Sequence, residues 1–239
     1  MDYKYNAIVL GSREIGETDR IYSFLTKENG RVRAIGRGTR KPIAKLAGNL
    51  ESLTQIEVFI HKTKGLGNIS GAIPVNSFLG IKENIDALEE VLSISRILEK
   101  IILEEQKEDV IYSHFESFLN LAERSIKKKK LIDFRFLKTS LLIKIFEKLG
   151  YRLEVDRCIE CGNKLIPGEN YFDFSQGGIF CRTCKKGKVG GTAISDDLIK
   201  TIRIILNNKL ESLVKLKLGE RERNNLEKLV KTFYQWIWN

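Results

Sequence analysis

The sequence predicts an α+β protein of several domains: a β-rich N-terminal domain, a helical domain and a cysteine-bearing insert before the last helices. Three observations support this. Apolar residues alternate along residues 1–80, they recur every three or four positions from residue 81, and all four cysteines fall within residues 156–188. We therefore expect a barrel domain at 1–80, a helical domain in two parts at 81–155 and 189–239, and a zinc insert at 156–188.

The β-rich part contains several short apolar segments joined by glycine turns. Strands are expected at residues 5–12, 31–36, 52–63 and 69–75, and residues 17–30 fit either a short helix or a strand. Asn29-Gly30 is a strong signal for a turn between two strands. Short strands at this density are typical of a small barrel or sandwich.

Helical periodicity follows from residue 81. Helices are expected over 81–106, 109–126 and 131–149, with Gly150 ending the third. A further helix should begin at Ser195, whose side chain suits the N-cap, and the last should run from about Glu220. The inward-facing positions expected in the first two helices are Ile81, Ile85, Leu88, Leu92, Ile101, Ile102, Phe115, Phe118, Leu119, Ala122 and Ile126.

Positive charge is concentrated at the two ends of the chain. The net charge is +10, from 41 Lys and Arg against 31 Asp and Glu, and residues 1–80 and 156–239 each contribute +5. The stretch from residue 31 to residue 45 holds six cations and no acid, which favours a polyanionic partner. A solvated loop is the alternative interpretation. The six candidate DNA-binding residues are Arg31, Arg33, Arg37, Arg40, Lys41 and Lys45.

The cysteines form two pairs, CIEC at 158–161 and CRTC at 181–184, separated by 19 residues. This is the spacing of a zinc site in which each pair turns around one ion as a knuckle. Four thiolates fill a tetrahedral shell, whereas a catalytic zinc keeps one position for water, so a structural Zn²⁺ is expected. A reduced tetrad without metal is the alternative. The expected ligands are Cys158, Cys161, Cys181 and Cys184.

Motifs for catalysis and for membrane insertion are missing from the sequence. GLGNISG has the wrong spacing for a dinucleotide loop, GRGTRK lacks P-loop spacing, and His61 and His114 lie in no metalloenzyme motif. No run reaches 18 apolar residues, and the start is unlike a signal peptide. We therefore expect a cytoplasmic binding protein that is not an enzyme.

Three blocks of sequence, in this order, resemble the RecO family of bacterial recombination mediators and DNA repair proteins. They are AIVLGSREIGETDRIYSFLTKENGRVRAIGRGTRK near the start, EKLGYRLEVDRCIECG in the middle, and FSQGGIFCRTC at the second cysteine pair. The similarity runs along essentially the whole chain. Members of the family vary in their cysteines, and this chain has the full set.

The resemblance implies an N-terminal OB-fold and a C-terminal helical domain. It also implies that the protein binds single- and double-stranded DNA and anneals complementary strands. Its expected partners are RecR and single-stranded DNA-binding protein, with which it would load RecA. The expected location is the bacterial cytoplasm, at the nucleoid. OB-folds bind single strands with a cationic groove and stacking aromatics. Tyr22, Phe24 and Phe59 are candidates for stacking, although each suits the core better. The acidic, hydrophobic tail of single-stranded DNA-binding protein would fit a groove within residues 190–239 that uses Lys200, Arg203, Trp236 and Trp238.

Three other functions fit parts of the sequence. A zinc-ribbon factor associated with RNA or the ribosome would prefer RNA over DNA. A zinc nuclease or deaminase would show metal-dependent turnover. A pure protein adaptor would show no salt-sensitive binding to nucleic acid.

Overall fold

The computed structural model describes residues 1–40, 45–63, 65–130, 132–186 and 190–238. The chain divides into two compact units, residues 1–131 and residues 132–239. The first unit therefore contains the barrel together with the helices α2 to α4, and the second contains the remaining helices together with the cysteine-bearing sheet. Lys41 lies outside the described residues, as does the side chain of Lys45.

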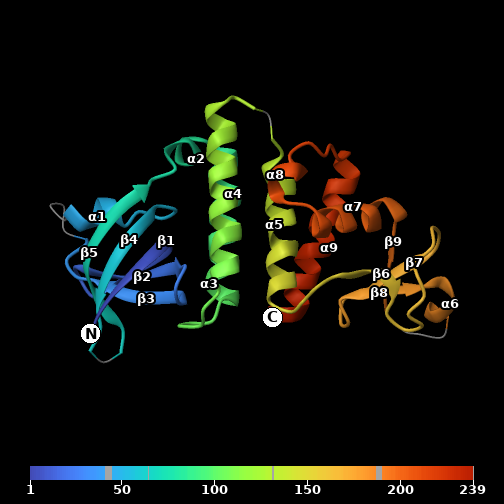
Figure 1. Ribbon diagram of the computed structural model, residues 1–239, viewed down its shortest axis with the longest axis horizontal. Coiled ribbons are helices and arrows are strands. Elements are labelled where there is room, and N and C mark those ends of the chain that lie inside the picture. Colours follow the sequence, from blue (N-terminus) through green and yellow to red (C-terminus); the bar gives the residue numbers. More distant parts are fainter. Residues whose placement is uncertain (41–44, 64, 131, 187–189, 239) are drawn as a thin grey trace. The chain divides into compact units, whose positions relative to one another are not determined.

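A closed five-stranded barrel forms the start of the first unit (Figure 1). Its strands are β1 (Asp2–Ile15), β2 (Asp19–Thr26), β3 (Gly30–Gly36), β4 (Gln55–His61) and β5 (Gly67–Asn76), and the short helix α1 (Lys45–Asn49) lies between β3 and β4. The order around the barrel is β1-β2-β3-β5-β4, with β3 and β5 parallel and the other pairs antiparallel. The predicted OB-fold is confirmed, and residues 17–30 supply a strand rather than a helix.

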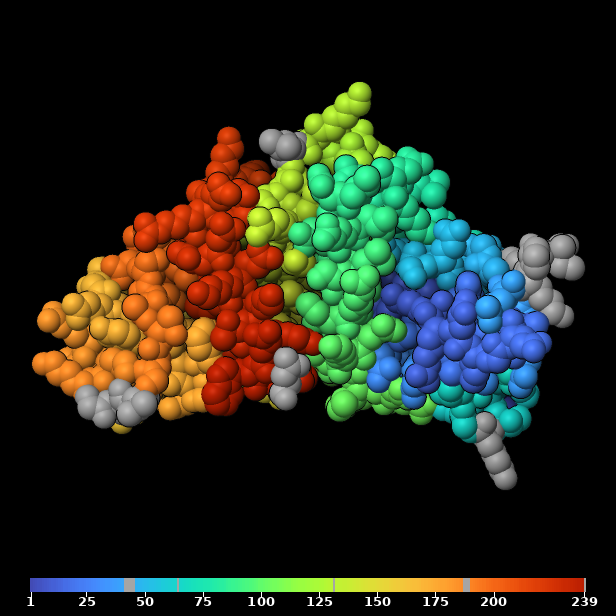
Figure 2. All heavy atoms as spheres, turned by 180° about the vertical axis from the view of Figure 1, so that it is seen from behind, coloured from blue at the N-terminus to red at the C-terminus, as the bar shows by residue number. Residues whose placement is uncertain are grey.

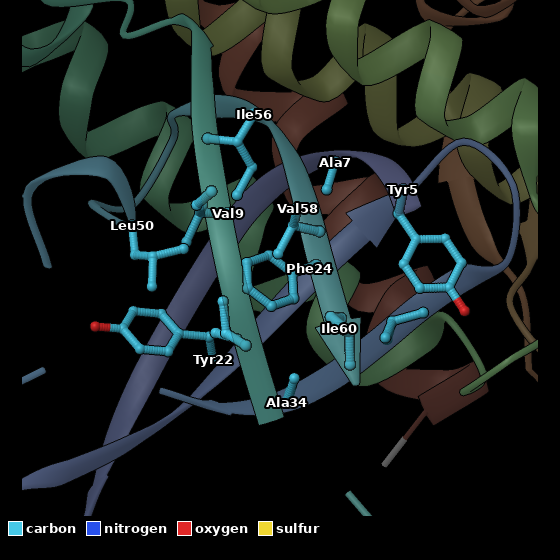
Figure 3. Packing of buried hydrophobic residues seen from close by; sticks show 13 residues of the cluster. Tyr5, Ala7, Val9, Tyr22, Phe24, Ala34, Leu50, Ile56, Val58 and Ile60 are labelled. Atoms are coloured by element: carbon cyan, nitrogen blue, oxygen red, sulfur yellow. The ribbon is translucent and has the colours of Figure 1, made fainter. Parts of the chain in front are cut away.

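Aromatic and β-branched side chains fill the barrel (Figure 3). Phe24 is fully buried and Tyr22 is 2% exposed, and both pack among residues of β1 and β4 such as Val9 and Val58. The strand β3 alternates regularly: Val32 and Ala34 point inward, and Arg31 and Arg33 do not. Figure 2 shows part of the surface that the first strands of the barrel form, in dark blue.

Three helices complete the first unit: α2 (Leu79–Glu83), α3 (Ile85–Ile101) and α4 (Asp109–Lys127). The helix α3 packs on β1, and α4 packs on β2. The expected face of α3 was partly wrong, because Ile85 is 82% exposed and the buried positions include Val91, Ile94 and Leu98. The expected helix over 81–106 also breaks at Asn84 and ends at Ile101, which leaves residues 102–108 as a non-helical link.

In the second unit α5 (Phe134–Lys148) packs on α7 (Asp196–Asn207), α8 (Leu210–Leu213) and α9 (Glu220–Trp238). Ser195 caps α7 by accepting a hydrogen bond from the backbone N–H of Leu198, as predicted. Gly150 follows α5 with a φ of 90°, a conformation that glycine adopts without strain. None of the helices in the described part of the chain has an apolar stretch that would cross a bilayer.

The cysteine-bearing insert is a four-stranded sheet of order β6-β8-β7-β9 (Figure 1). Its strands are β6 (Glu154–Cys158), β7 (Asn170–Asp173), β8 (Gly178–Cys181) and β9 (Thr192–Ile194), and the short helix α6 (Arg182–Lys185) follows β8. The strands β7 and β8 form the hairpin expected around Gln176-Gly177-Gly178. Gly178 is required there, because a Cβ at this position would lie 2.3 Å from Ile159 Cγ2.

Candidate metal centre and nucleic-acid interface

The two predicted knuckles come together. Cys158 ends β6, Cys161 lies on the turn that follows, and Cys181 and Cys184 lie at the end of β8 and in α6. All four sulfur atoms lie within 4.8 Å of one another, and none forms a disulfide. Gly162 adopts a φ of 70° and donates its N–H to the carbonyl of Cys158, which closes the first knuckle.

The four thiols would not ionise together without a cation. Burial by itself raises the pKa of Cys158, but hydrogen bonds from the backbone N–H groups of Cys161, Cys181 and Glu160 outweigh it and lower this pKa to about 6. For Cys184, desolvation and the hydrogen bonds with the other thiols raise the pKa to about 12. A divalent cation at the centre would stabilise all four thiolates and remove this conflict.

The geometry of the cluster fits a tetrahedral metal ion. With metal–sulfur bonds of about 2.3 Å, tetrahedral thiolates lie about 3.8 Å apart, within the spread of this cluster. The first knuckle begins at the end of β6 and the second at the end of β8, so an ion bound here would cross-link these two strands. The four cysteines can therefore bind a metal ion.

The other predicted site lies at one end of the barrel, where the turn after β1 meets the loop after β3. Arg37 donates from Nε to Oδ1 of Asn68 (3.0 Å), and its guanidinium lies 3.6 Å from Asp19, with 70% of the side chain exposed. Arg40 donates to the carbonyl of Gly16 (3.0 Å) and lies 3.2 Å from Glu14. The two arginines therefore present cations from one loop at the same end of the barrel.

Arg31 and Arg33 lie apart from this end and share one acid, Glu104. Arg31 donates from Nε to the carbonyl of Ile102 (2.9 Å) and lies 3.2 Å from the carboxylate of Glu104. Arg33 forms an ion pair with the same carboxylate. Each described cation of the acid-free stretch thus has an acidic neighbour, which comes from another segment of the chain.

The three aromatic candidates divide between core and surface. Tyr22 and Phe24 lie inside the barrel, so their rings cannot stack on the bases of DNA. Phe59 is half-buried on β4 with the Nζ of Lys4 5.8 Å from the centre of its ring. It borders a pocket of about 370 Å³ that Tyr3 and Gly71 also line.

The residues expected to bind an acidic tail are dispersed in the second unit. Lys200 lies 3.3 Å from Asp197. The guanidinium of Arg203 donates to the carbonyl of Val155 and lies 3.2 Å from Asp156. The ring of Trp238 packs against those of Phe146, Tyr151 and Tyr234, whereas Trp236 is 61% exposed.

A groove of about 640 Å³ lies elsewhere in this unit, between α9 and the strands β7 and β9. Phe172 and Leu229 line it, and Arg221 and Lys228 border it from α9. Both cations are exposed and have no ion-pair partner among the described residues. Trp236 falls on the same face of α9, eight residues beyond Lys228 and close to two helical turns away.

Sequence patterns missed Glu104 and the two cations of the groove. Glu104 falls inside the helix expected over 81–106, and nothing local marks it as a partner of β3. Arg221 and Lys228 are spaced seven residues apart on α9, a helical spacing that could have indicated a common face. Their position against β7 and β9 arises from long-range packing.

The chain is thus a multidomain protein with a closed OB-type barrel that carries exposed arginines, followed by helices and a four-cysteine centre. Two family models match the chain: the N-terminal model of recombination protein O over residues 1–78, and its C-terminal model over residues 82–237. Together they cover nearly the whole chain.

Curated relatives agree with these matches. The chain is 26% identical to the DNA repair protein RecO of Dehalococcoides mccartyi over 99% of this chain and 90% of that protein. It is 26% identical to the RecO of Desulfitobacterium hafniense (94% and 81%) and 25% identical to that of Acetivibrio thermocellus (96% and 89%). The chain therefore belongs to the RecO family of DNA repair proteins.

Proposed function

We propose that this chain is a DNA-binding recombination mediator of the bacterial cytoplasm that acts without catalysing a reaction of its own. It binds single- and double-stranded DNA, anneals complementary strands and, with RecR, helps to load RecA onto strands coated by single-stranded DNA-binding protein. Annealing would be electrostatic: cations of the barrel neutralise two phosphate backbones and bring the strands together.

The observation that carries this proposal is the exposure of Arg37 at the end of an OB-type barrel in a RecO-family chain. Its ion pair with Asp19 is long and lies at the surface, where such pairs contribute about 0–1 kcal/mol. A phosphate can replace the carboxylate at little cost. The expected mode of binding uses the backbone of DNA and has little sequence preference.

The ion at the four cysteines is proposed to be a structural Zn²⁺. Four thiolates complete its tetrahedral shell, so it would hold β6 and β8 together. No step of annealing uses it.

Annealing should depend on the cations at the end of the barrel. The wild-type chain is expected to accelerate pairing of two complementary fluorescent oligonucleotides, and Arg37→Ala/Arg40→Ala should lose most of this acceleration because two phosphate contacts disappear. The control is Lys128→Ala/Lys130→Ala, which removes two exposed cations from the loop after α4. Equal loss in both variants would show that general charge, rather than this end of the barrel, drives annealing.

The groove beside α9 is proposed to take the acidic tail of single-stranded DNA-binding protein. Arg221 and Lys228 would face its carboxylates, and the floor at Phe172 and Leu229 would hold its apolar side chains. This assignment replaces Lys200 and Arg203, whose cations already contact acids of the same unit.

A labelled peptide of acidic and aromatic residues that ends in a free carboxylate tests the groove. Arg221→Ala/Lys228→Ala should weaken its binding by tenfold or more, which corresponds to about 1.4 kcal/mol. Lys200→Ala/Lys231→Ala, which removes two exposed cations outside the groove, should leave binding nearly unchanged. If the second variant weakens binding as much as the first, the tail binds elsewhere.

A further inference from the structure

The link between α3 and α4 lies along the open edge of β3. Among the described residues, β3 pairs with β5 only at Ala34 and Ile35, so no described strand of the barrel lies on that side of its first half. Residues 102–108, called the strap here, lie there instead: Glu104 forms a parallel bridge with Arg31, and the N–H of Glu105 donates to the carbonyl of Arg31 (3.0 Å).

The strap places two carboxylates on cations of the barrel. Glu104 contacts Arg31 and Arg33 of β3, and Glu105 binds the ammonium of Lys62 just after β4. The hydrogen bond with Glu105 is the main cause of a raised pKa at Lys62. Three cations from two strands therefore converge on adjacent acids.

Most of the strap is exposed to solvent: residues 103–107 are exposed, whereas Ile102 at its start is buried. Glu105 adopts a φ of 57°, which is strained for a residue with a side chain. The described contacts of the strap with β3 include one backbone hydrogen bond, the hydrogen bond from Arg31 to the carbonyl of Ile102, and the ion pairs. The backbone of Gln106 also packs on Gly30, where a Cβ would lie 1.8 Å from the Gln106 carbonyl oxygen. The paired side chains of Arg33, Glu104, Lys62 and Glu105 are all about one third to one half exposed, so solvent and salt weaken these pairs.

Carboxylates and phosphates are recognised by the same guanidinium geometry. We propose that Arg31, Arg33 and Lys62 form a second phosphate site for single-stranded DNA, which the carboxylates of Glu104 and Glu105 occupy in the free protein. The strap is thus an internal competitor, and DNA binding at this site displaces it. This inference rests on the proposed DNA binding and adds Lys62 to the residues that would serve it.

The first test is a salt titration of labelled oligo(dT) binding by the full chain. Glu104→Gln/Glu105→Gln keeps the size of both side chains and removes their charge. It should bind more tightly by roughly 10- to 25-fold at 0.1 M salt, with a slope of log K against log salt steeper by about 1.4, or 0.7 for each of two added phosphates. Glu83→Gln/Glu89→Gln removes two exposed acids that pair with no described cation, and it measures the general effect of charge.

The arginines decide whether the gain is specific. In a background of Arg31→Ala/Arg33→Ala, the same glutamine changes should give only the gain of the control. Two results would contradict competition by the strap while leaving the proposed DNA binding intact. One is a gain in affinity in the wild-type background no larger than that of the control, and the other is a gain that persists without the two arginines. Failure of the wild type and all variants to bind would overturn the proposed function as well.

Hydrogen exchange on the wild-type chain gives an independent result that no substitution can confound. The amide of Glu105, which is bonded to β3 in the free protein, should exchange faster when oligo(dT) is added, because the strap leaves the edge. Unchanged or slower exchange at this amide in the presence of saturating DNA would contradict displacement.

Discussion

Replacing Cys158 and Cys181 with serine is expected to abolish binding of the proposed Zn²⁺ and to unfold the sheet β6 to β9. Cys158 belongs to the first knuckle and Cys181 to the second, so each knuckle would keep only one of its two thiolate ligands. Structural zinc stabilises small domains by on the order of 10 kcal/mol, which is comparable to the whole free energy of unfolding of a typical domain. The strands are short, and they bury only a small set of apolar side chains: Val155, Phe172, Ile179, Phe180 and Ile194.

Metal content and hydrogen exchange together measure this effect. The wild-type chain should contain about one zinc ion, and the double variant close to none. Fast exchange should be confined to residues 154–194, while the barrel strands keep their protection, since they form a separate unit. Thr183→Ala, inside the second knuckle but not a ligand, should match the wild type. A metal-free variant whose sheet stays protected would show that the cysteines do not hold this fold together.

Local patterns in the sequence predicted most of the secondary structure. The alternation at Val32 and Ala34, the turn at Gly30 and the N-cap at Ser195 depend on neighbours within a few residues, so sequence alone carries that information. The cysteine spacing predicted the cluster for a related reason. Each knuckle is a local turn, and a four-cysteine metal site needs two of them.

Contacts between distant segments were beyond such patterns. Ile85 has the spacing of a buried residue but lies at the first turn of α3, where no neighbour covers it. The acid-free stretch suggested unpaired cations, yet Glu104 follows Arg31 by more than 70 positions and still binds it. The pairing of acids with arginines depends on how the barrel closes. A short stretch of sequence does not carry that information.

The central claim is that the cations after β3 bind the phosphate backbone of DNA. Arg37→Ala/Arg40→Ala/Lys41→Ala, called the loop variant here, removes three cations that follow β3 in the sequence and should weaken binding of single-stranded DNA by about 100-fold at 0.1 M salt. This follows from a loss of about 0.7 in slope for each phosphate contact, or about 2 in total, over the tenfold range of salt below 1 M. The matched control, Lys128→Ala/Lys129→Ala/Lys130→Ala, removes three exposed cations near the end of α4.

The measurement that tests this most directly is a salt titration of a fluorescent single-stranded oligonucleotide with these three proteins. We predict steep salt dependence for the wild type and the control, and a slope flatter by about 2 for the loop variant. If the wild type does not bind, or if the loop variant matches it in affinity and slope, the loop is a solvated or protein-docking surface and the DNA-binding account is contradicted.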